Sequence, residues 1–491
     1  MIAAQAICDK SGFDFVELFG GQYCLSAEPQ SRPEGWRQTE TFAGWQLTHC
    51  PSLQRRDLVN GVGQQIGWLL GVVVNADGHC LGDESYTIDS ASWSGVEAQL
   101  ATLAGRFLAV VLTASGRRVY FDPVMDLPSV FNAKARCVAS SPLLALHRPL
   151  EVNHRTDHRL IHKQGGNYGL QQTCDRDVLR GLSNHYLDLD SFSLHRHWPA
   201  PDLDFSPDPA PLDEIAARIT TRFGQITGAL MSSYDCLIPL SGGADSRTLA
   251  FSARDKIHLA KGCYAHRTNF NTELDCYVAN QLAEALGTEL HLIDAITDAP
   301  DRQTVKRLRW DFWYRTGYHA APTPPELAAS ALVPKADFIL RANILDMAIA
   351  NQWPRDNRFD LGHAVSKLNI GSRAPEEDLT YWGPDYQNWA KTVPQNAQPA
   401  LYEMAFLEQL LPNTLGARLL GYRGSTYLNP FNDRGLIRAC MRVSPKDRKS
   451  GRLTQALHKA CGAPDIPMIR QIKRDETLLA EAKARTAEMF G

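Results

Sequence analysis

The chain has 491 residues, of which 44% are hydrophobic and 21% charged, and its net charge at pH 7 is −3. This length allows two or three domains, and the near-neutral charge gives no reason to expect nucleic acid or an anionic membrane as a partner. No apolar run is long enough to span a bilayer, and the N-terminus lacks the pattern of a signal peptide. Eleven cysteines without a Cys-x-x-Cys pair favour reduced thiols over disulfides or a zinc site. We therefore expect a cytoplasmic protein.

The N-terminal part of the chain, residues 1–198, is rich in short β-like runs. Apolar stretches at residues 66–74, 107–112 and 118–121 are separated by turn-forming sequences such as residues 114–116. Such runs, punctuated by turns, are typical of strands. This part of the sequence predicts a layered α+β domain.

Residues 199–211 contain repeated prolines, which forbid a continuous helix or a central strand. We predict a semi-rigid linker here. Apolar residues at helical spacing then follow, with Asp213 and Glu214 near their start, and predict a helix over residues 212–230.

Beyond this helix, predicted strands alternate with predicted helices. Strands are expected at residues 236–240, 261–265, 289–293 and 337–340, and an amphipathic helix over residues 273–286 stops at Gly287. Such alternation predicts an α/β fold with a doubly wound parallel sheet. In such sheets the ligand binds at the carboxyl ends of the strands.

The sequence Ser-Gly-Gly-Ala-Asp-Ser at residues 241–246 stands between a predicted strand and a predicted helix. Glycines let backbone N–H groups approach phosphate oxygens, the helix N-terminus favours anions, and Asp245 can hold Mg²⁺. The alternative is a glycine turn with a Ser/Asp helix cap. The residues that we predict to bind ATP and its pyrophosphate are Leu240, Ser241, Gly242, Gly243, Asp245, Ser246, Arg247 and Tyr264.

A second segment, residues 340–346, follows another predicted strand and ends at Asp346. Together with the 241–246 loop it resembles the asparagine-synthetase family, whose synthetase domain carries an N-type ATP pyrophosphatase loop (PP-loop). The resemblance implies that Asp346 supplies a second carboxylate to the Mg²⁺ held by Asp245, with ATP as the nucleotide. Residues 429–445 and 470–473 resemble the family's Pro-Phe-Leu-Asp segment with its helix and its closing basic segment.

Residues 105–109, 121–123 and 138–141 resemble landmarks of the family's glutaminase-like domain. The resemblance implies an Ntn-type layered domain over residues 1–198, a linker over 199–211, and a synthetase domain over 212–491. The family's glutaminase uses a cysteine directly after the initiator Met, whereas this chain has Ile2, and Cys8 or Cys24 could serve only after cleavage. The pattern is therefore closer to β-lactam synthetase, carbapenam synthetase and lasso peptide cyclases, which retain this domain as a scaffold.

The activity that this resemblance implies is ATP-dependent ligation without glutamine hydrolysis. A substrate carboxylate would attack the α-phosphorus of ATP, releasing pyrophosphate, and an amine would then form an amide and release AMP. The expected substrate is a small molecule or peptide carrying both groups, so that a lactam or macrolactam closes in a specialised metabolite. A homodimer or a biosynthetic partner protein fits the same resemblance.

The chain departs from the family in the residues of the second step. Asn343 stands where the family has Glu or Tyr, and Thr454 or Gln455 stands where it has a lysine. The residues expected to act in catalysis are therefore Asn343, Arg341, Lys449, Arg452 and Lys473. Two alternatives stay open: an enzyme that joins separate carboxylate and amine substrates, and a degenerate homologue that acts as a binding subunit.

Overall fold

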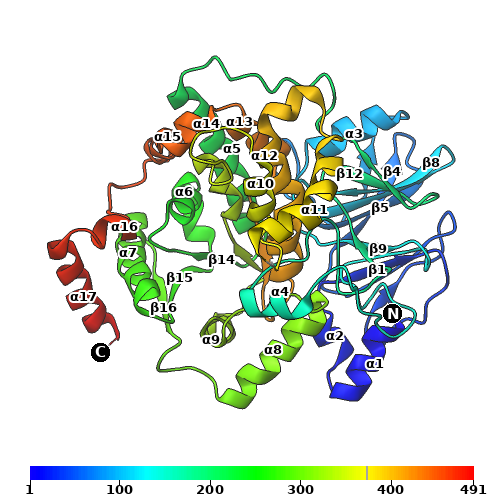
Figure 1. Ribbon diagram of the computed structural model, residues 1–491, viewed down its shortest axis with the longest axis horizontal. Helices are drawn as coiled ribbons and strands as arrows, with labels where there is room; N and C mark the ends of the chain where they lie inside the picture. The colour runs from blue at the N-terminus through cyan, green and yellow to red at the C-terminus, as the bar shows by residue number, and fades with distance from the viewer. Residues whose placement is uncertain (372–373, 491) are drawn as a thin grey trace.

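The computed structural model describes residues 1–371 and 374–490, and Figure 1 shows the arrangement of the elements. Helices and strands are mixed along the chain, and the strands form three sheets in the described ranges. The predicted α/β class is confirmed. The same ranges contain no helix with the length and apolar character needed to cross a bilayer.

The N-terminal part builds two sheets whose strands are almost all antiparallel. One has the order β11-β9-β10-β1-β3-β2, and the other has the order β13-β12-β8-β7-β5-β4-β6, in which only β4 and β6 pair in parallel. The strands of the first are β1 (Tyr23–Ser26), β2 (Arg37–Gln38), β3 (Gln46–His49), β9 (Val130–Asn132), β10 (Cys137–Ala139) and β11 (Leu179–Arg180). Those of the second are β4 (Arg55–Asn60), β5 (Gln65–Val74), β6 (Tyr86–Ile88), β7 (Ala104–Thr113), β8 (Gly116–Phe121), β12 (His185–Asp188) and β13 (Ser193–Arg196).

These two sheets pack face to face, with helices on their outer faces. Side chains alternate across a strand, so β7 directs Leu108 and Val110 into the core between the sheets and Phe107 toward α3 (Trp93–Ala101) on the outer face. On the other side, α1 (Ile2–Ser11) and α2 (Phe15–Leu18) share a core with residues of β1 and β10. The result is a layered α+β arrangement, as the sequence predicts.

The third sheet is entirely parallel and has the order β16-β15-β14-β17-β18. Its strands are β14 (Cys236–Pro239), β15 (Gly262–Arg267), β16 (Leu290–Asp294), β17 (Phe338–Leu340) and β18 (Thr426–Leu428). One face shares a core with the long helix α5 (Leu212–Ser233), and the other packs against residues that follow α9 (Pro324–Leu332). Because β14 lies at the centre and the chain winds outward from it in both directions, this sheet is doubly wound.

The remaining helical segments surround this sheet or bridge it to the N-terminal layers (Figure 1). They are α4 (His158–Gln164), α6 (Ala244–Ser252), η1 (Arg254–Leu259), α7 (Phe270–Leu286), α8 (Arg302–Thr316), η2 (Asn343–Ile349), α10 (Leu361–Lys367), α11 (Pro375–Ala390), η3 (Gln395–Ala400), α12 (Leu401–Ala405), η4 (Phe406–Leu410), η5 (Pro412–Ala417), α13 (Arg434–Met441), α14 (Pro445–Lys449), α15 (Arg452–Cys461), α16 (Ile469–Ile472) and α17 (Glu476–Phe490). Helix α7 ends at Gly287, whose φ of 64° is the left-handed conformation that glycine adopts without strain. Segments η4 and η5 are wound as π-helices.

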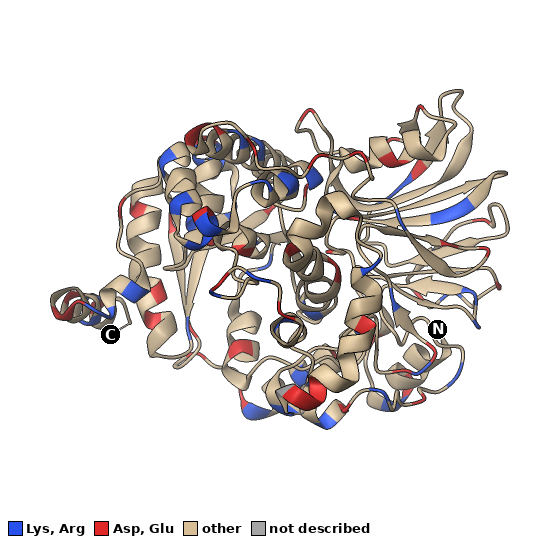
Figure 2. Cartoon of the chain, turned by 45° about the horizontal axis from the view of Figure 1, so that its top comes forward, with Lys and Arg blue, Asp and Glu red and all other residues tan. Residues whose placement is uncertain are grey.

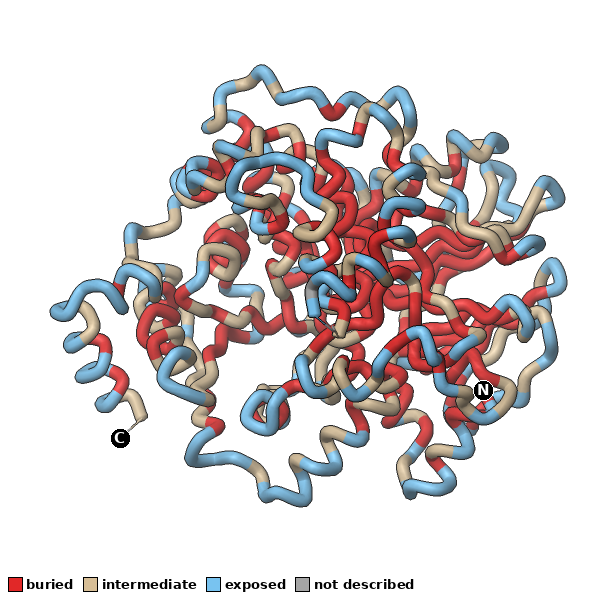
Figure 3. The backbone as a smooth tube through the Cα atoms, viewed as in Figure 1, coloured by how far each residue is buried: buried red, intermediate tan, exposed pale blue. Residues whose placement is uncertain are grey.

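Buried polar contacts connect the N-terminal layers to the third sheet. The Asn432 side chain donates to the Gly105 carbonyl at 2.6 Å and to Asp122 at 2.7 Å. The Asn429 backbone N–H donates to Asp126 at 3.0 Å. Figure 3 shows that buried backbone runs without a break through the middle of the molecule. The interior is therefore shared by the two parts, and the boundaries at residues 198 and 211 stay predictions.

Candidate functional site

The candidate site lies where the strand order of the third sheet reverses. Strands β14 and β17 are neighbours, with Leu237 opposite Ile339, and each is followed by one of the two segments that the sequence singles out. The 241–246 loop leaves β14, and residues 341–346 leave β17. Parallel strands end at the same edge, so both segments emerge side by side at the crevice where open α/β sheets bind ligands.

Neither glycine of the loop has the backbone conformation of a sharp turn, and close packing explains Gly242. Gly243 caps α6 with φ −82° and ψ 165°, which other residues adopt freely. The φ angle of Gly242 is not positive either. However, a Cβ at Gly242 would lie 2.5 Å from Cγ1 of Ile469. Gly242 therefore allows α16 to approach the loop backbone closely.

The loop presents its N–H groups to acceptors. The N–H groups of Ser241 and Gly243 donate to the hydroxyls of Ser246 and Ser241, at 3.2 and 3.3 Å. The Gly242 N–H donates to Oδ1 of Asp275 on α7 at 2.8 Å. A carboxylate thus already accepts a hydrogen bond from one backbone N–H of the loop. Burial raises the pKa of Asp275, while the Gly242 N–H and the charge of Lys473 oppose the increase.

Asp245 and Asp346 lie close enough for the charge of Asp346 to act on Asp245. Burial and the neighbouring charge of Asp346 raise the pKa of Asp245 to about 7. Burial also raises the pKa of Asp346, and the charge of Lys367 lowers it in part. Two such carboxylates fit Mg²⁺, which proteins hold through one or two carboxylates plus phosphate and water. Within residues 1–371 and 374–490 no cluster of three or more His, Cys, Asp or Glu is built for a metal, so any bound Mg²⁺ would need such outside ligands.

A cavity of about 650 Å³, named here the site cavity, opens beside this carboxylate pair. It contains the predicted residues Tyr264, Arg341, Asn343 and Asp346. Its lining also includes His266, Glu326, Lys367, Arg418, Tyr422 and Tyr427. The structure thus brings Asp346, one of the two metal candidates, and two of the five expected catalytic residues, Arg341 and Asn343, to the wall of one cavity.

Three cations of the site cavity form no ion pair with the described residues, although the charge of Lys367 acts on Asp346. The three are Arg341, Lys367 and Arg418. The Arg341 guanidinium lies over the Tyr427 ring, 5.7 Å from its centroid. Cations concentrated in a cleft attract anionic substrates. The cavity is therefore suited to phosphate and carboxylate groups.

Asn343 offers an unused hydrogen-bond acceptor beside these cations. Its Oδ1 is buried and has no hydrogen-bond partner among the described residues, and its side chain lines the site cavity. Most buried polar atoms have partners, so an orphan next to a cavity points to a ligand group. An amide oxygen can accept from a substrate N–H.

Most predicted residues lie outside the site cavity: the 240–246 segment with Asp245, and also Arg247, Lys449, Arg452 and Lys473. Arg247 is 2% exposed, and its Nη1 donates to the Ile466 carbonyl at 2.7 Å. Lys449 donates to the Pro354 carbonyl, and Arg452 forms an exposed ion pair with Asp447 at 2.6 Å. Lys473 donates to Asn271 at 2.6 Å, near Asp275. These contacts hold segments of the C-terminal part together.

Sequence reasoning missed three residues of this region: Lys367, Arg418 and Asp275. Lys367 is the last residue of the seven-residue helix α10, and Arg418 follows the π-helical segment η5. Neither belongs to a recognisable motif. The sequence indicates a role for Asp275 only weakly, as an acidic residue next to the apolar run of α7.

The cysteines considered as nucleophiles are buried in the N-terminal layers. Cys8 is 4% exposed and Cys24 is 1% exposed. Burial raises the pKa of the Cys8 thiol to about 12, which disfavours the reactive thiolate. The expectation that the N-terminal part hydrolyses no glutamine stays a prediction.

Acidic and basic residues are interspersed over the elements in Figure 2, in keeping with the net charge of −3.

Comparison with known proteins finds no matching family model and no similar curated protein. The function must therefore be argued from the site itself.

Proposed function

We propose that this protein is an ATP-dependent carbon–nitrogen ligase of the asparagine-synthetase type. It would adenylate a substrate carboxylate, release pyrophosphate, and join the acyl group to a substrate amine. One observation carries the proposal: the 241–246 loop and residues 341–346 emerge from adjacent strands and set Asp245 against Asp346 beside a cationic cavity. The resemblance of both segments to the family supports the same function.

In the first step, the loop would hold the pyrophosphate end of ATP. The Ser241 and Ser246 hydroxyls, which contact each other at 2.9 Å, would donate to phosphate oxygens, and the start of α6 favours their negative charge. Asp245 and Asp346 would hold Mg²⁺, which when bound neutralises the charge of the leaving pyrophosphate.

The cations of the site cavity would orient the substrate carboxylate toward the α-phosphorus. Arg341 and Arg418 present planar guanidinium groups that can bind a carboxylate with two hydrogen bonds. Lys367 approaches Asp346 closely enough to lower its pKa, so its ammonium would be available to a phosphate bound beside Asp346. We propose that Lys367 supplies the positive charge that the family places at the position of Thr454 or Gln455.

In the second step, a substrate amine would attack the acyl-adenylate. The Asn343 amide oxygen would accept one amine hydrogen and orient the nitrogen. His266 lines the same cavity, and burial and Arg341 lower its pKa, so its imidazole is neutral at neutral pH. A neutral imidazole can accept the proton that the amine releases.

The proposal is tested by nucleotide binding and by ATP–pyrophosphate exchange with a panel of candidate carboxylates. The wild-type protein is expected to bind Mg-ATP and to catalyse exchange when its substrate is present. Asp245→Ala should abolish exchange, whereas Asp255→Ala should not, because the Asp255 side chain is 95% exposed and lies after α6. Failure of the wild-type protein to bind Mg-ATP would contradict the proposal.

The role of Lys367 is tested against Lys449 as a matched control. Loss of one charge-stabilising group should reduce the exchange rate about 100-fold in Lys367→Met. Lys449→Met should change it little, since Lys449 donates to the Pro354 carbonyl outside the cavity. If Lys449→Met reduced the exchange rate more than Lys367→Met, Lys449 and not Lys367 would supply the positive charge.

One observation favours a second candidate, a homologue that binds nucleotide without catalysis. The loop N–H groups already donate to Asp275 and to loop hydroxyls. Nucleotide binding without exchange for any carboxylate would support this candidate. For an active enzyme, product mass with and without an added amine distinguishes ring closure from ligation of two substrates.

A further inference from the structure

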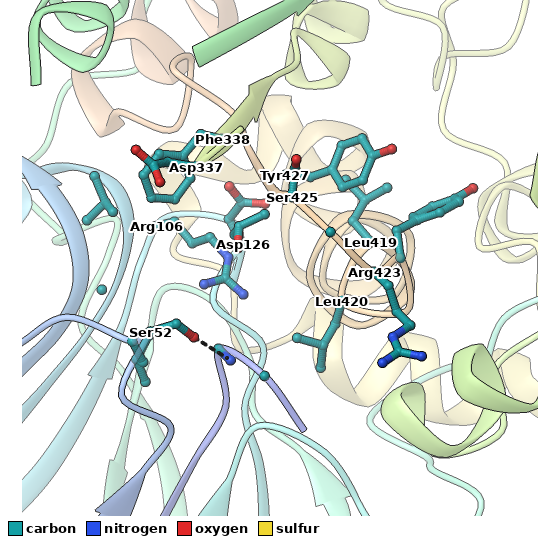
Figure 4. Close-up of a pocket in the computed structure, with 18 of the residues that line it drawn as sticks. Ser52, Arg106, Asp126, Asp337, Phe338, Leu419, Leu420, Arg423, Ser425 and Tyr427 are labelled. Carbon is teal, nitrogen blue, oxygen red and sulfur yellow. Dashed lines mark hydrogen bonds between the residues drawn. The ribbon is translucent and has the colours of Figure 1, made fainter. Parts of the chain in front are cut away.

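A second cavity, of about 510 Å³, lies between the N-terminal layers and the third sheet; we name it the interlayer cavity. Figure 4 shows its walls, with Ser52 and Arg106 from the N-terminal part and Phe338, Leu419 and Leu420 from the C-terminal part. It shares Leu415, Leu419, Tyr422 and Tyr427 with the site cavity. These residues form a wall common to both cavities.

Arg106, on β7, is a buried cation that the nearby charges of Asp126 and Asp122 stabilise in part, but that has no hydrogen-bond partner among the described residues. It is only 6% exposed, and Figure 4 shows its guanidinium projecting into the interlayer cavity. No residue that the structure describes accepts a hydrogen bond from this guanidinium or forms an ion pair with it. The charges of Asp126 and Asp122 offset part of the cost of burying this cation, but N–H donors that lack an acceptor remain costly. A group with this environment points to a ligand that completes it.

The acidic residues around the cavity are engaged elsewhere. Both oxygens of Asp126 accept hydrogen bonds from Asn429. Glu17 pairs with Arg423 at 2.6 Å, and Asp337 accepts from the Asp235 N–H at 3.0 Å. None of these carboxylates forms an ion pair with Arg106, so two N–H donors on one edge of its guanidinium are available to a ligand.

The cavity fits an organic carboxylate better than a polyphosphate. Arg315, another cation of its wall, already donates to the backbone carbonyls of Glu17, Leu18 and Leu420, so a single guanidinium fork remains. One fork matches one carboxylate with two parallel hydrogen bonds. Apolar walls from Leu53, Val72 and Leu420 suit an aliphatic body.

We propose that the interlayer cavity is a binding site for an aliphatic carboxylate, with Arg106 as the group that recognises the carboxylate. The site is separate from the 241–246 loop and does not rest on the proposed ligase function. A ligand held there would lie against the wall that borders the site cavity.

The test is isothermal titration of the full chain with N-acetyl-L-leucine, N-acetyl-L-leucinamide and inorganic phosphate. The acid should bind at least about tenfold more tightly than the amide or phosphate, since a charge-assisted bidentate pair contributes more than a neutral contact. Absence of binding by the acid, or equal binding of acid and amide, would overturn the proposal. Phosphate that binds as tightly as the acid would also overturn it, in favour of a general anion site.

Variants of Arg106 then test whether the acid binds in the interlayer cavity. Arg106→Met should weaken binding of the acid at least about tenfold, and Arg106→Lys, which keeps the charge but loses the fork, should weaken it by a smaller factor. Arg117→Met serves as control, because Arg117 is exposed and pairs with Asp190 outside the cavity. If circular dichroism shows that Arg106→Met does not fold, the affinity of Arg106→Lys for the acid decides whether Arg106 binds it. Unchanged affinity in the folded Arg106 variants overturns the assignment, and Asp245→Ala is expected to leave binding intact.

Discussion

At the residue scale, the contact between Asp275 and Gly242 bears directly on the loop. The Asp275 carboxylate accepts from the N–H that a phosphate would need, at 2.8 Å. Asp275→Asn removes the negative charge and weakens this competition, so Mg-pyrophosphate should bind up to about tenfold more tightly. Titration of the variant with Mg-pyrophosphate measures the change.

The matched control for this prediction is Glu284→Gln, on the exposed surface of the same helix, where Glu284 accepts from Asn280 at 2.7 Å. This variant should bind as the wild type does. Weaker binding by Asp275→Asn would show instead that the carboxylate orders the loop for its ligand.

Single residues also show where sequence reasoning succeeds and where it stops. Asp245 and Asp346 were proposed from segments that directly follow predicted strands, and the parallel sheet brings these segments together. Lys367 and Arg418 reach the same cavity from helical segments far along the chain. Their position depends on tertiary packing, which local sequence patterns do not encode.

At the scale of elements, a buried ion pair fixes the segment that carries Asp346. Arg448 on α14 is 1% exposed, donates to the Met347 carbonyl at 2.8 Å, and pairs with Glu403 on α12. Glu403 also accepts from Trp353 at 2.6 Å. These contacts join η2, α12 and α14 behind the site.

Arg448→Met should therefore lower the free energy of unfolding by about 3–5 kcal/mol, because it leaves Glu403 buried without its cation. Urea unfolding measures the loss. Arg485→Met removes an exposed pair with Glu488 and should cost less than about 1 kcal/mol. Similar losses for both variants would show that the Arg448–Glu403 pair contributes little.

Elements with a clear periodicity were predicted closely. The expected strand at residues 66–74 is β5 (Gln65–Val74), and the expected helix at 212–230 is α5 (Leu212–Ser233). Short or irregular elements, such as β18 and the π-helical segments η4 and η5, have no such signal. Their conformation is set by the neighbours against which they pack.

At the scale of the whole molecule, Asp126 links the N-terminal layers to the third sheet through Asn429. Burial and the charge of Asp122 raise the pKa of Asp126 to about 7, above its ordinary value of about 4 in an unfolded chain. Between these values the folded state binds more protons than the unfolded state. The Asp126 contribution to stability therefore decreases as pH rises from about 4 to about 7, by at most about 1.4 kcal/mol per pH unit, and then levels off.

Urea unfolding of the wild type and of Asp126→Asn at several pH values between about 5 and 8 tests this linkage. The asparagine variant does not titrate, so its stability relative to the wild type should increase with pH up to about 7. Parallel pH profiles for the two proteins would contradict the raised pKa.

The mixed α/β class and the layered N-terminal part followed from the sequence, whereas the contacts between the parts did not. Asn432 and Asp122 lie 310 residues apart in the chain, and no periodicity connects them. The division into domains remains a prediction, because the two parts share one buried interior (Figure 3).

The π-helical winding of η4 and η5 has a consequence for how such a chain could change its ligand. This stretch contributes Phe406, Leu410 and Thr414 to the site cavity and leads into Arg418. A π turn accommodates one residue more than an α turn. Deleting the extra residue of such a turn would restore an α turn and leave the residues after it in register, so that only side chains within the turn change position. A change in length of one codon would thus exchange side chains of this stretch that line the site cavity, while the two carboxylates, set by the spacing of adjacent strands, stay in place.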